Sequence, residues 1–392
     1  MELDEHLRRA QARLAHIRRD IHAHPETAFE ERRTAALVAE HLRALGLEVH
    51  TGLGRTGLVG VLRAGSSARG VGLRADMDAL PMEERNTFEH RSRHAGKMHA
   101  CGHDGHVAML LGAAEYLSAA RAFDGSIYFI FQPAEEGQGG AAEMIRDGLF
   151  ERFPMQAVFG LHNWPGLAAG RFAVRAGPMM ASSDEFEISV RGRGGHAAMP
   201  HLTADPIVAG AAIVQALQTL VSRNVAPVEA GVVSVTQFHA GEAFNVIPPQ
   251  ACLRGTARAF SPQVRDALEA GIARVAGSVA AALGTEAELH YRRGYPPTIN
   301  TPAEAAFCAT VAAEVLGAGQ VHQDLPPTMG AEDFAFMLQE KPGAYVWLGN
   351  GEGEGGCMLH SPVFDFNDAI IPLGVAYWVR LAQRFLARRP EE

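Results

Sequence analysis

The sequence predicts an α/β fold in which helices cover both faces of a largely parallel sheet and a smaller α+β domain is inserted. Two observations support this fold class. Apolar runs without polar alternation, such as 126–131, recur between helical segments, as expected for strands that are buried on both faces. Between residues 183 and 298 the expected order becomes strand, helix, two strands, helix, strand, which is the split βαβ arrangement.

The first part of the chain, residues 1–182, alternates helices and strands. Residues 4–23 and 31–45 are rich in Ala, Leu and Arg, with apolar residues at helical spacing. The Asp124-Gly125 pair is a turn signal before a buried strand. We expect strands at 57–63, 70–75, 126–131 and 156–161, with further helices at 105–120 and 139–148.

The middle part, residues 183–298, begins with alternation, because Phe186, Ile188 and Val190 would share one face of a strand. Asp205-Pro206 marks the start of a helix. We expect strands at 185–191, 231–238, 251–259 and 286–291, and helices at 203–223 and 262–283. In the last part, residues 299–392, we expect a helix at 302–317, a turn at 330–334, a strand at 344–348 and a helix at 370–388.

Composition limits the possible functions. A chain of 392 residues is too long for one core, so two domains are expected. The content of 47% hydrophobic and 20% charged residues is typical of soluble globular proteins. The net charge of −9, without basic runs interleaved with aromatics, argues against nucleic acid as a partner. No apolar stretch approaches the ~18 residues of a membrane span, and no signal peptide is visible.

The cysteines indicate the compartment. The chain has four, widely scattered, which is not the pattern of a disulfide framework. We therefore expect a reducing, cytoplasmic location. They are Cys101, Cys252, Cys308 and Cys357.

Metal-ligating side chains follow several of the apolar runs. Because the carboxyl ends of parallel strands meet at one edge of a sheet, thiolate, imidazole and carboxylate groups there predict a divalent-metal site. A metal with a spare carboxylate can activate water. The candidates in chain order are Asp76, Asp78, Cys101, His103, Glu135, Glu136, His162 and His360.

Each candidate also has a structural interpretation. A lone Cys is normally a small buried hydrophobe, but His99, Asp104 and His106 crowd Cys101 and His103. A Cys-His protease is disfavoured, because its nucleophile and base usually come from separate elements. A single His at a strand end is commonly a packing residue, and the paired aspartates could equally ligate, orient a ligand or cap a helix. Adjacent glutamates in extended chain point opposite ways, so one could bind metal while the other faces substrate.

Together these segments resemble the di-metal aminoacylase and carboxypeptidase family. They most resemble its amidohydrolase branch, which includes bacterial hippurate hydrolases and plant indole-acetyl-amino-acid hydrolases. The resemblance covers nearly the whole chain, and many ordered motifs make chance an inadequate explanation. The motifs are 19–26, 74–81, 98–106, 132–137, 160–164, 194–200, 245–248, 330–334 and 359–368.

The resemblance implies a doubly wound zinc-peptidase-like catalytic domain, residues 1–182 and 299–392, with a ferredoxin-like βαββαβ domain, residues 183–298, inserted as a lid or dimerisation domain. A homodimer or higher homo-oligomer would form through that insert. It implies two divalent metal ions, Zn²⁺ or Mn²⁺, and Glu135 as the general base. The implied ligands are Cys101, His103, Glu136, His162 and His360.

The chain departs from many relatives outside this branch, which have His-x-Asp where it has Asp76-Met77-Asp78. The Cys101/His103 pair would replace the lost His ligand, with Cys101 favoured as the bridge between the ions and the two aspartates as residues that orient the ligands. In the insert, His196, Asn245 and Arg258 match positions that hold the substrate carbonyl and carboxylate. Without the resemblance, they would be a turn His and a strand-edge Arg.

The leading hypothesis is a metal-dependent amidohydrolase that cleaves the amide bond of a small-molecule N-acyl amino acid, hippurate-like or N-acetylated. A dipeptidase or carboxypeptidase with the same di-metal site is the enzyme alternative. A binding protein on the same scaffold is the non-enzyme alternative, and the full ligand set argues against it. The sequence identifies neither the acyl group nor the amino acid.

Overall fold

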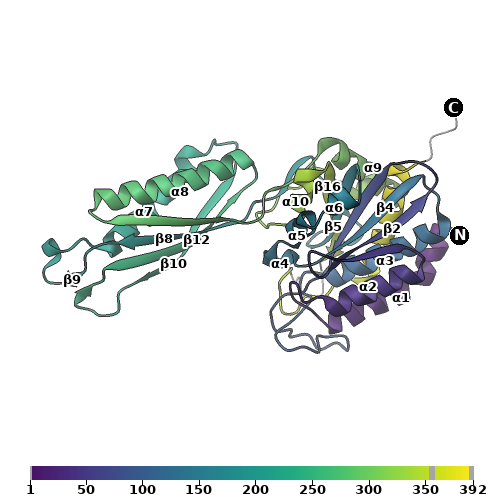
Figure 1. The fold of residues 1–392 in the computed structure, drawn as a ribbon, viewed down its shortest axis with the longest axis horizontal. Helices are drawn as coiled ribbons and strands as arrows, with labels where there is room; N and C mark the ends of the chain where they lie inside the picture. The colour runs from purple at the N-terminus through teal and green to yellow at the C-terminus, as the bar shows by residue number, and fades with distance from the viewer. Residues whose placement is uncertain (1, 353–357, 388–392) are drawn as a thin grey trace. The chain divides into compact units, whose positions relative to one another are not determined.

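The computed structural model describes residues 2–352 and 358–387, so Cys357 lies outside the described residues. It divides into two compact units, each visible in Figure 1. The first contains Met1–Gly177, Ile299–Pro326 and Asp333–Glu392, and the second contains Pro178–Thr298 and Pro327–Glu332. Among the described residues, no helix has both the length and the apolar character that crossing a membrane requires.

The first unit is built on an eight-stranded sheet in the order β1-β2-β4-β3-β5-β16-β6-β15. Its four central strands, β4, β3, β5 and β16, run parallel, as their apolar runs predict. Their residues alternate between two buried faces. The strands are β1 (Glu48–Leu53), β2 (Gly57–Ala64), β3 (Gly70–Asp76), β4 (Gly125–Gln132), β5 (Ala157–Pro165), β6 (Phe172–Ala173), β15 (Val321–His322) and β16 (Gly343–Gly351).

The sheet is largely parallel, as expected, but it contains antiparallel pairs toward both edges. β1 pairs antiparallel with β2, β2 with β4, and β6 with β16. β1 was not predicted, because its side chains are mostly exposed or half-buried and it therefore has no apolar run. Gly54, at φ +57°, helps the chain turn back between the two strands.

Helices cover both faces of this sheet (Figure 1). On one face, Ala344 and Val346 of β16 share a core with five helices. Between them, Tyr345 points to the other face and meets Phe334 of α10, with ring centroids 5.7 Å apart. The five are α1 (Leu3–Ala23), α2 (Arg32–Ala44), α3 (His103–Ala120), α9 (Pro302–Leu316) and α11 (Ile371–Phe385); α5 (Gly140–Arg146), α6 (Leu149–Arg152) and α10 (Phe334–Glu340) lie on the other side.

The second unit is the predicted split βαβ domain. Its four strands are antiparallel in the order β10-β12-β8-β13, and α7 and α8 pack on one face of them through residues such as Ile213 and Ile272. Asp205 caps α7 by accepting from the backbone N–H of Ile207. The elements are β8 (Asp184–Arg191), α7 (Pro206–Thr219), β10 (Gly231–Ala240), β12 (Gln250–Ala259), α8 (Pro262–Ala282) and β13 (Glu286–Arg293).

Candidate metal centre

The candidate ligands of the first unit gather beyond the carboxyl ends of the parallel strands. Asp76 is the last residue of β3, and Glu135 and Glu136 follow β4. His162 lies near the end of β5. Cys101 and His103 come from the chain that leads into α3, while His360 lies in a turn. This is the edge where open α/β sheets usually form their sites.

The backbone around the Cys101/His103 pair is tightly constrained. Gly102 has φ +95° and caps α3. A Cβ at Gly102 would lie 2.2 Å from Oδ1 of the buried Asn163, so no other residue fits without displacing that amide. Glycine therefore allows the thiol and the imidazole to approach the end of β5 from one short segment.

Two overlapping groups of ligand atoms result. The ligand atoms of Cys101, His103 and His162 all lie within 4.8 Å of one another, as do those of Cys101, Glu136 and His360. Sγ of Cys101 is 3.3 Å from Nε2 of His162, and Nε2 of His360 is 3.2 Å from Oε1 of Glu136. Cys101 belongs to both groups, and only His360 among the five is substantially exposed.

The imidazoles are oriented by hydrogen bonds on their outer nitrogens. Nδ1 of His103 lies 2.9 Å from the carbonyl oxygen of Asp78, and Nδ1 of His162 lies 2.6 Å from that of Asn163. Both Nε2 atoms are thus left for the cluster. Within the described part of the chain, Nε2 of His103 is buried without a hydrogen-bond partner. An unpaired imidazole nitrogen beside a thiol and carboxylates fits divalent metal ions.

The electrostatics of the cluster also fit cations. Burial, followed by the charges of Glu136 and Glu135, raises the pKa of the Cys101 thiol well above its usual value. A bound cation would reverse that direction, since it stabilises the thiolate. Burial lowers the pKa of His103, but the charge of Asp76 and a hydrogen bond to Asp78 outweigh it and raise the pKa to about 10. Burial and His106 lower the pKa of His162, which keeps this imidazole neutral and able to ligate.

Asp76 and Asp78 both lie beside the candidate ligand His103. Oδ2 of Asp78 accepts from the backbone N–H of Glu136 at 2.9 Å, and its Oδ1 lies 3.3 Å from Nδ1 of His103. Asp76 is fully buried and lies 3.7 Å from Nε2 of His103. Arg74 donates to Asp76 at 2.6 Å, so the buried carboxylate is paired.

Glu135 belongs to the same cluster but has a different environment. The residue is 7% exposed, and its carboxylate accepts a long hydrogen bond, 3.4 Å, from the backbone N–H of Asp333. The Asp333 carboxylate is in turn held by Gln132 at 2.7 Å and by the N–H of Ala141 at 2.9 Å. These two hydrogen bonds fix the position of Asp333, whose backbone N–H donates to Glu135.

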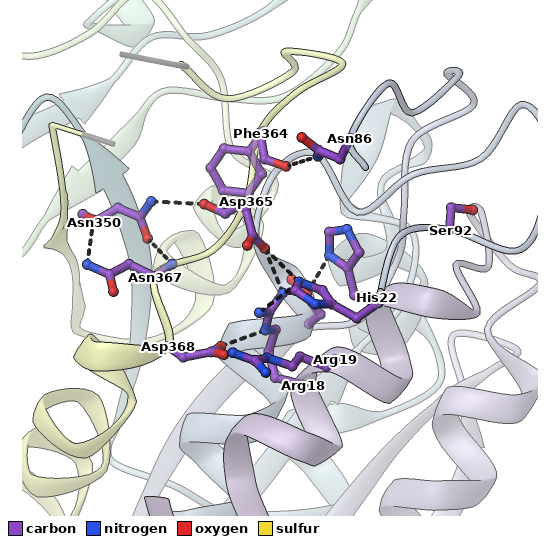
Figure 2. A network of polar contacts seen from close by, with 12 residues as sticks. Arg18, Arg19, His22, Asn86, Ser92, Asn350, Phe364, Asp365, Asn367 and Asp368 are labelled. Atoms are coloured by element: carbon purple, nitrogen blue, oxygen red, sulfur yellow. Dashed lines mark hydrogen bonds and ion pairs between the residues drawn. The ribbon is translucent and has the colours of Figure 1, made fainter. Parts of the chain in front are cut away.

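A second polar network holds residues 364–368, the segment that follows His360 in the sequence (Figure 2). Arg18 is 1% exposed and donates to Asp365 at 2.8 Å and to Asp368 at 2.7 Å. It also lies 3.4 Å from Asp104, the neighbour of His103. One buried guanidinium therefore ties the start of α3 to residues 365–368.

The candidate substrate residues lie in the second unit. His196 pairs with Val246 between the short strands β9 (Gly195–His196) and β11 (Val246–Ile247). The carbonyl oxygen of Asn245 accepts from the N–H of Ala197 at 3.0 Å, so His196 and Asn245 are neighbours. Arg258 lies on β12, in a groove of about 500 Å³ that also includes Thr236, Arg254, His290 and Arg292.

Arg258 is a half-buried cation without an ion pair. Its Nε donates to the hydroxyl of Thr256 at 3.2 Å, and no ion pair involves it among the residues that the structure describes. Burial lowers its pKa, against the charges of Asp184 and Glu185. Neighbouring arginines of the groove differ, since Arg254 pairs with Glu187 and Arg292 with Glu185.

Comparison with known proteins assigns the chain to a family. Residues 72–384 match Peptidase family M20/M25/M40. The chain belongs to this family. Its relatives include the hippurate hydrolase of Campylobacter jejuni, 43% identical over 94% of this chain and 96% of that protein. Thermostable carboxypeptidase 1 of Saccharolobus solfataricus is 40% identical over 94% of each chain. Family membership and these relatives identify the chain as a hydrolase.

A solved structure agrees with the fold of this M20 protein. The YXEP protein of Bacillus subtilis, a dinuclear metal-binding peptidase from the M20 family, superposes with a TM-score of 0.85 at 34% identity. The match covers 97% of this chain and 99% of that one.

Several buried polar residues around the site of this M20 protein had no role assigned to them from the sequence, His106 among them. His106 is 2% exposed, with Nδ1 2.5 Å from Asp76 and Nε2 2.7 Å from Oδ1 of Asn163. Arg74 and Asp333 were noted only as parts of motifs. Arg74 and Gln132 are polar residues near the ends of buried strands, and they were the signal that could have revealed these buried polar contacts. A buried charge requires a partner.

Proposed function

We propose that the protein is a metal-dependent amidohydrolase that cleaves the amide bond of N-acyl amino acids, with hippurate-like or N-acetyl compounds as the substrate class. One observation carries the proposal. Five candidate ligand side chains form two groups that share Cys101, and a separate buried carboxylate, Glu135, lies among them. A hippurate hydrolase at 43% identity supports the choice of substrate class.

We further propose that two divalent ions, Zn²⁺ or Mn²⁺, are held by the candidate ligands. Cys101 would bridge them, since it belongs to both groups of ligand atoms. When bound, such ions lower the pKa of water and stabilise negative charge on a carbonyl oxygen. The ligands are Cys101, His103, Glu136, His162 and His360, and Asp76 and Asp78 orient them.

Glu135 would act as the general base. Its carboxylate accepts a proton from the water that attacks the carbonyl carbon, and returns it to the leaving nitrogen when the C–N bond breaks. The products are a carboxylic acid and a free amino acid. Burial suits this exchange because it keeps bulk water from competing for the proton. The N–H of Asp333 restrains the carboxylate at one oxygen.

In the second unit, Arg258 would bind the carboxylate of the substrate. Its guanidinium has no ion pair among the described residues, and a planar fork suits a carboxylate. His196 is exposed and its Nδ1 accepts from the N–H of Ala198, so Nε2 remains able to donate to a carbonyl oxygen. Asn245 would assist as its neighbour.

A carboxypeptidase or dipeptidase is the second candidate function. The relative named as a carboxypeptidase, at 40% identity, favours it. A guanidinium that recognises a terminal carboxylate would serve either class. The substrates of the two enzyme classes differ only in the group on the acyl side of the amide bond that is cleaved.

The proposal includes a homodimer or higher homo-oligomer that forms through the second unit, and a cytoplasmic location. Met199, Leu202 and Phe244 expose large apolar side chains near β9 and β11, and apolar surface of this kind favours association. Cys101, Cys252 and Cys308 are free thiols, as a reducing compartment allows. Sedimentation of the wild type and of Phe244→Ser tests the assembly.

The decisive experiment is a substrate panel. Hippurate, N-acetyl amino acids and dipeptides are assayed with protein stripped by chelator and then reloaded with Zn²⁺ or Mn²⁺, with Glu135→Gln as the matched inactive control. Turnover of N-acyl amino acids that requires metal and Glu135 supports the proposal. Turnover of dipeptides alone favours the second candidate, and no turnover with full metal content contradicts both.

A further inference from the structure

The chain adopts a strained conformation immediately before Glu135. Ala134 has φ +54° and ψ +42°, a left-handed conformation that costs free energy for any residue with a Cβ. The strain sits between β4 and the two glutamates of the site. Such a conformation persists only where surrounding groups enforce it.

Glu31 supplies one of the enforcing contacts. Its side chain is fully buried, and Oε1 accepts from the backbone N–H of Ala134 at 2.8 Å and from that of Phe29 at 3.0 Å. Its Oε2 accepts from the hydroxyl of Thr56 at 2.6 Å. All three partners donate hydrogen bonds to Glu31, so the side chain at position 31 must be an acceptor.

The loop is held from its other side by close backbone packing. The carbonyl oxygen of Ala134 accepts from the N–H of Gly140 at 3.0 Å. A Cβ at Gly140 would lie 1.7 Å from the carbonyl oxygen of Pro133. Ala134 is therefore held at its N–H by Glu31 and at its carbonyl oxygen by Gly140.

The segment that ends at Glu31 also holds the aspartate loop. The N–H of Ala79 donates to the carbonyl oxygen of Glu26 at 2.8 Å, and Thr27 forms a bridge with Ala79. Asp78, one residue before, accepts from the N–H of Glu136. Residues 26–31 thus contact both loops that carry the acidic residues of the site.

We propose that Glu31 is a positioning residue that sets the left-handed turn at Ala134 and thereby aims Glu135 and Glu136 into the metal centre. Its side-chain hydrogen bonds go to Ala134, Phe29 and Thr56, none of which is a candidate ligand. The inference rests on the proposed roles of Glu135 and Glu136. The structural part of the inference, that Glu31 orders residues 133–138, can be tested without an activity assay.

The first test is amide hydrogen exchange of the metal-loaded protein. Glu31→Leu, similar in shape but without an acceptor, should accelerate exchange at 133–138 by at least about tenfold, since exchange reports local opening. Glu31→Gln should restore slow exchange, because its amide oxygen can accept both N–H groups. Glu40→Leu, which removes an exposed glutamate from helix α2, whose N-cap is Glu31, is the matched control. Exchange in Glu31→Leu equal to that of Glu40→Leu would overturn the proposal.

The second test separates positioning from general destabilisation. In Glu31→Leu, kcat should fall about 10- to 100-fold with KM changed less than about twofold, and Glu31→Gln should stay within a few-fold of the wild type. A loss that appears equally in kcat and KM, or is not rescued by Gln, contradicts positioning. If Glu31→Leu does not fold, Thr56→Val removes one donor only and should give a smaller acceleration of exchange at 133–138; no acceleration contradicts the role of Glu31.

The two tests distinguish failure of this inference from failure of the proposed function. If the wild type shows no turnover on the substrate panel, the proposed function is contradicted. The exchange comparison would still report whether Glu31 orders the loop. A wild type with turnover, and exchange unchanged by Glu31→Leu, removes this inference alone.

Discussion

The stability of the first unit should depend on pH through His22, which lies beside the buried Arg18 network (Figure 2). Its Nδ1 is 2.9 Å from Asp104 and its Nε2 is 3.2 Å from Glu84. Burial lowers the pKa of His22, but hydrogen bonds to the two carboxylates outweigh burial and raise the pKa to about 9. Protonated His22 therefore stabilises the folded state.

The magnitude follows from the two pKa values. A rise from 6.5 to about 9 corresponds to about 3 kcal/mol, at roughly 1.4 kcal/mol per pKa unit. Because the folded pKa is the higher one, this contribution is fully present below pH 6.5. It decreases as the pH rises and is lost once the pH passes about 9.

Urea unfolding of the wild type and of His22→Gln, from pH 6 to pH 10, measures this effect. All three tryptophans, Trp164, Trp347 and Trp378, lie in the first unit, so their fluorescence reports its unfolding. The difference in free energy of unfolding between wild type and variant should shrink by about 3 kcal/mol over this range. His16→Gln, on the same helix, should follow the wild type at every pH. A difference that stays constant from pH 6 to pH 10 would refute the argument.

Three further predictions concern the site. Glu135→Gln should retain the fold and the bound metal but lose about 10²- to 10⁴-fold in kcat; loss of metal together with activity, measured by atomic absorption, would instead make Glu135 a ligand. Cys101→Ser should lower metal content and activity together, since a hydroxyl poorly replaces a thiolate, and full metal occupancy in that variant contradicts ligation by Cys101. Arg258→Ala should raise KM roughly ten- to a hundredfold at unchanged metal content, as expected for losing a charge-assisted hydrogen bond of about 1.5–3 kcal/mol. That effect should vanish for substrates whose carboxylate is an amide, and Arg292→Ala, whose side chain already pairs with Glu185, is its control.

Most of the fold was predictable because its elements carry strong local patterns. The apolar run at 126–131 became β4, and the Ala-rich segment at 262–283 became α8 with Ser261 as its cap. β1 and α10 were missed for different reasons. β1 is an exposed edge strand, and α10, only seven residues long, depends on Phe334 packing against Tyr345. Short or exposed elements gain their stability from tertiary contacts, which leave little periodicity in the sequence.

For the site, the sequence by itself determined which side chains are available and that several follow buried strands. Only the tertiary structure decided which atoms meet. The 3.3 Å approach of Cys101 to His162 spans 61 positions of sequence and depends on Gly102 fitting against Asn163. The contact of Glu31 with Ala134 spans 103 positions. No local pattern encodes such distances, because they are set by how β4 and β5 pack in the sheet and by the backbone turns at their ends.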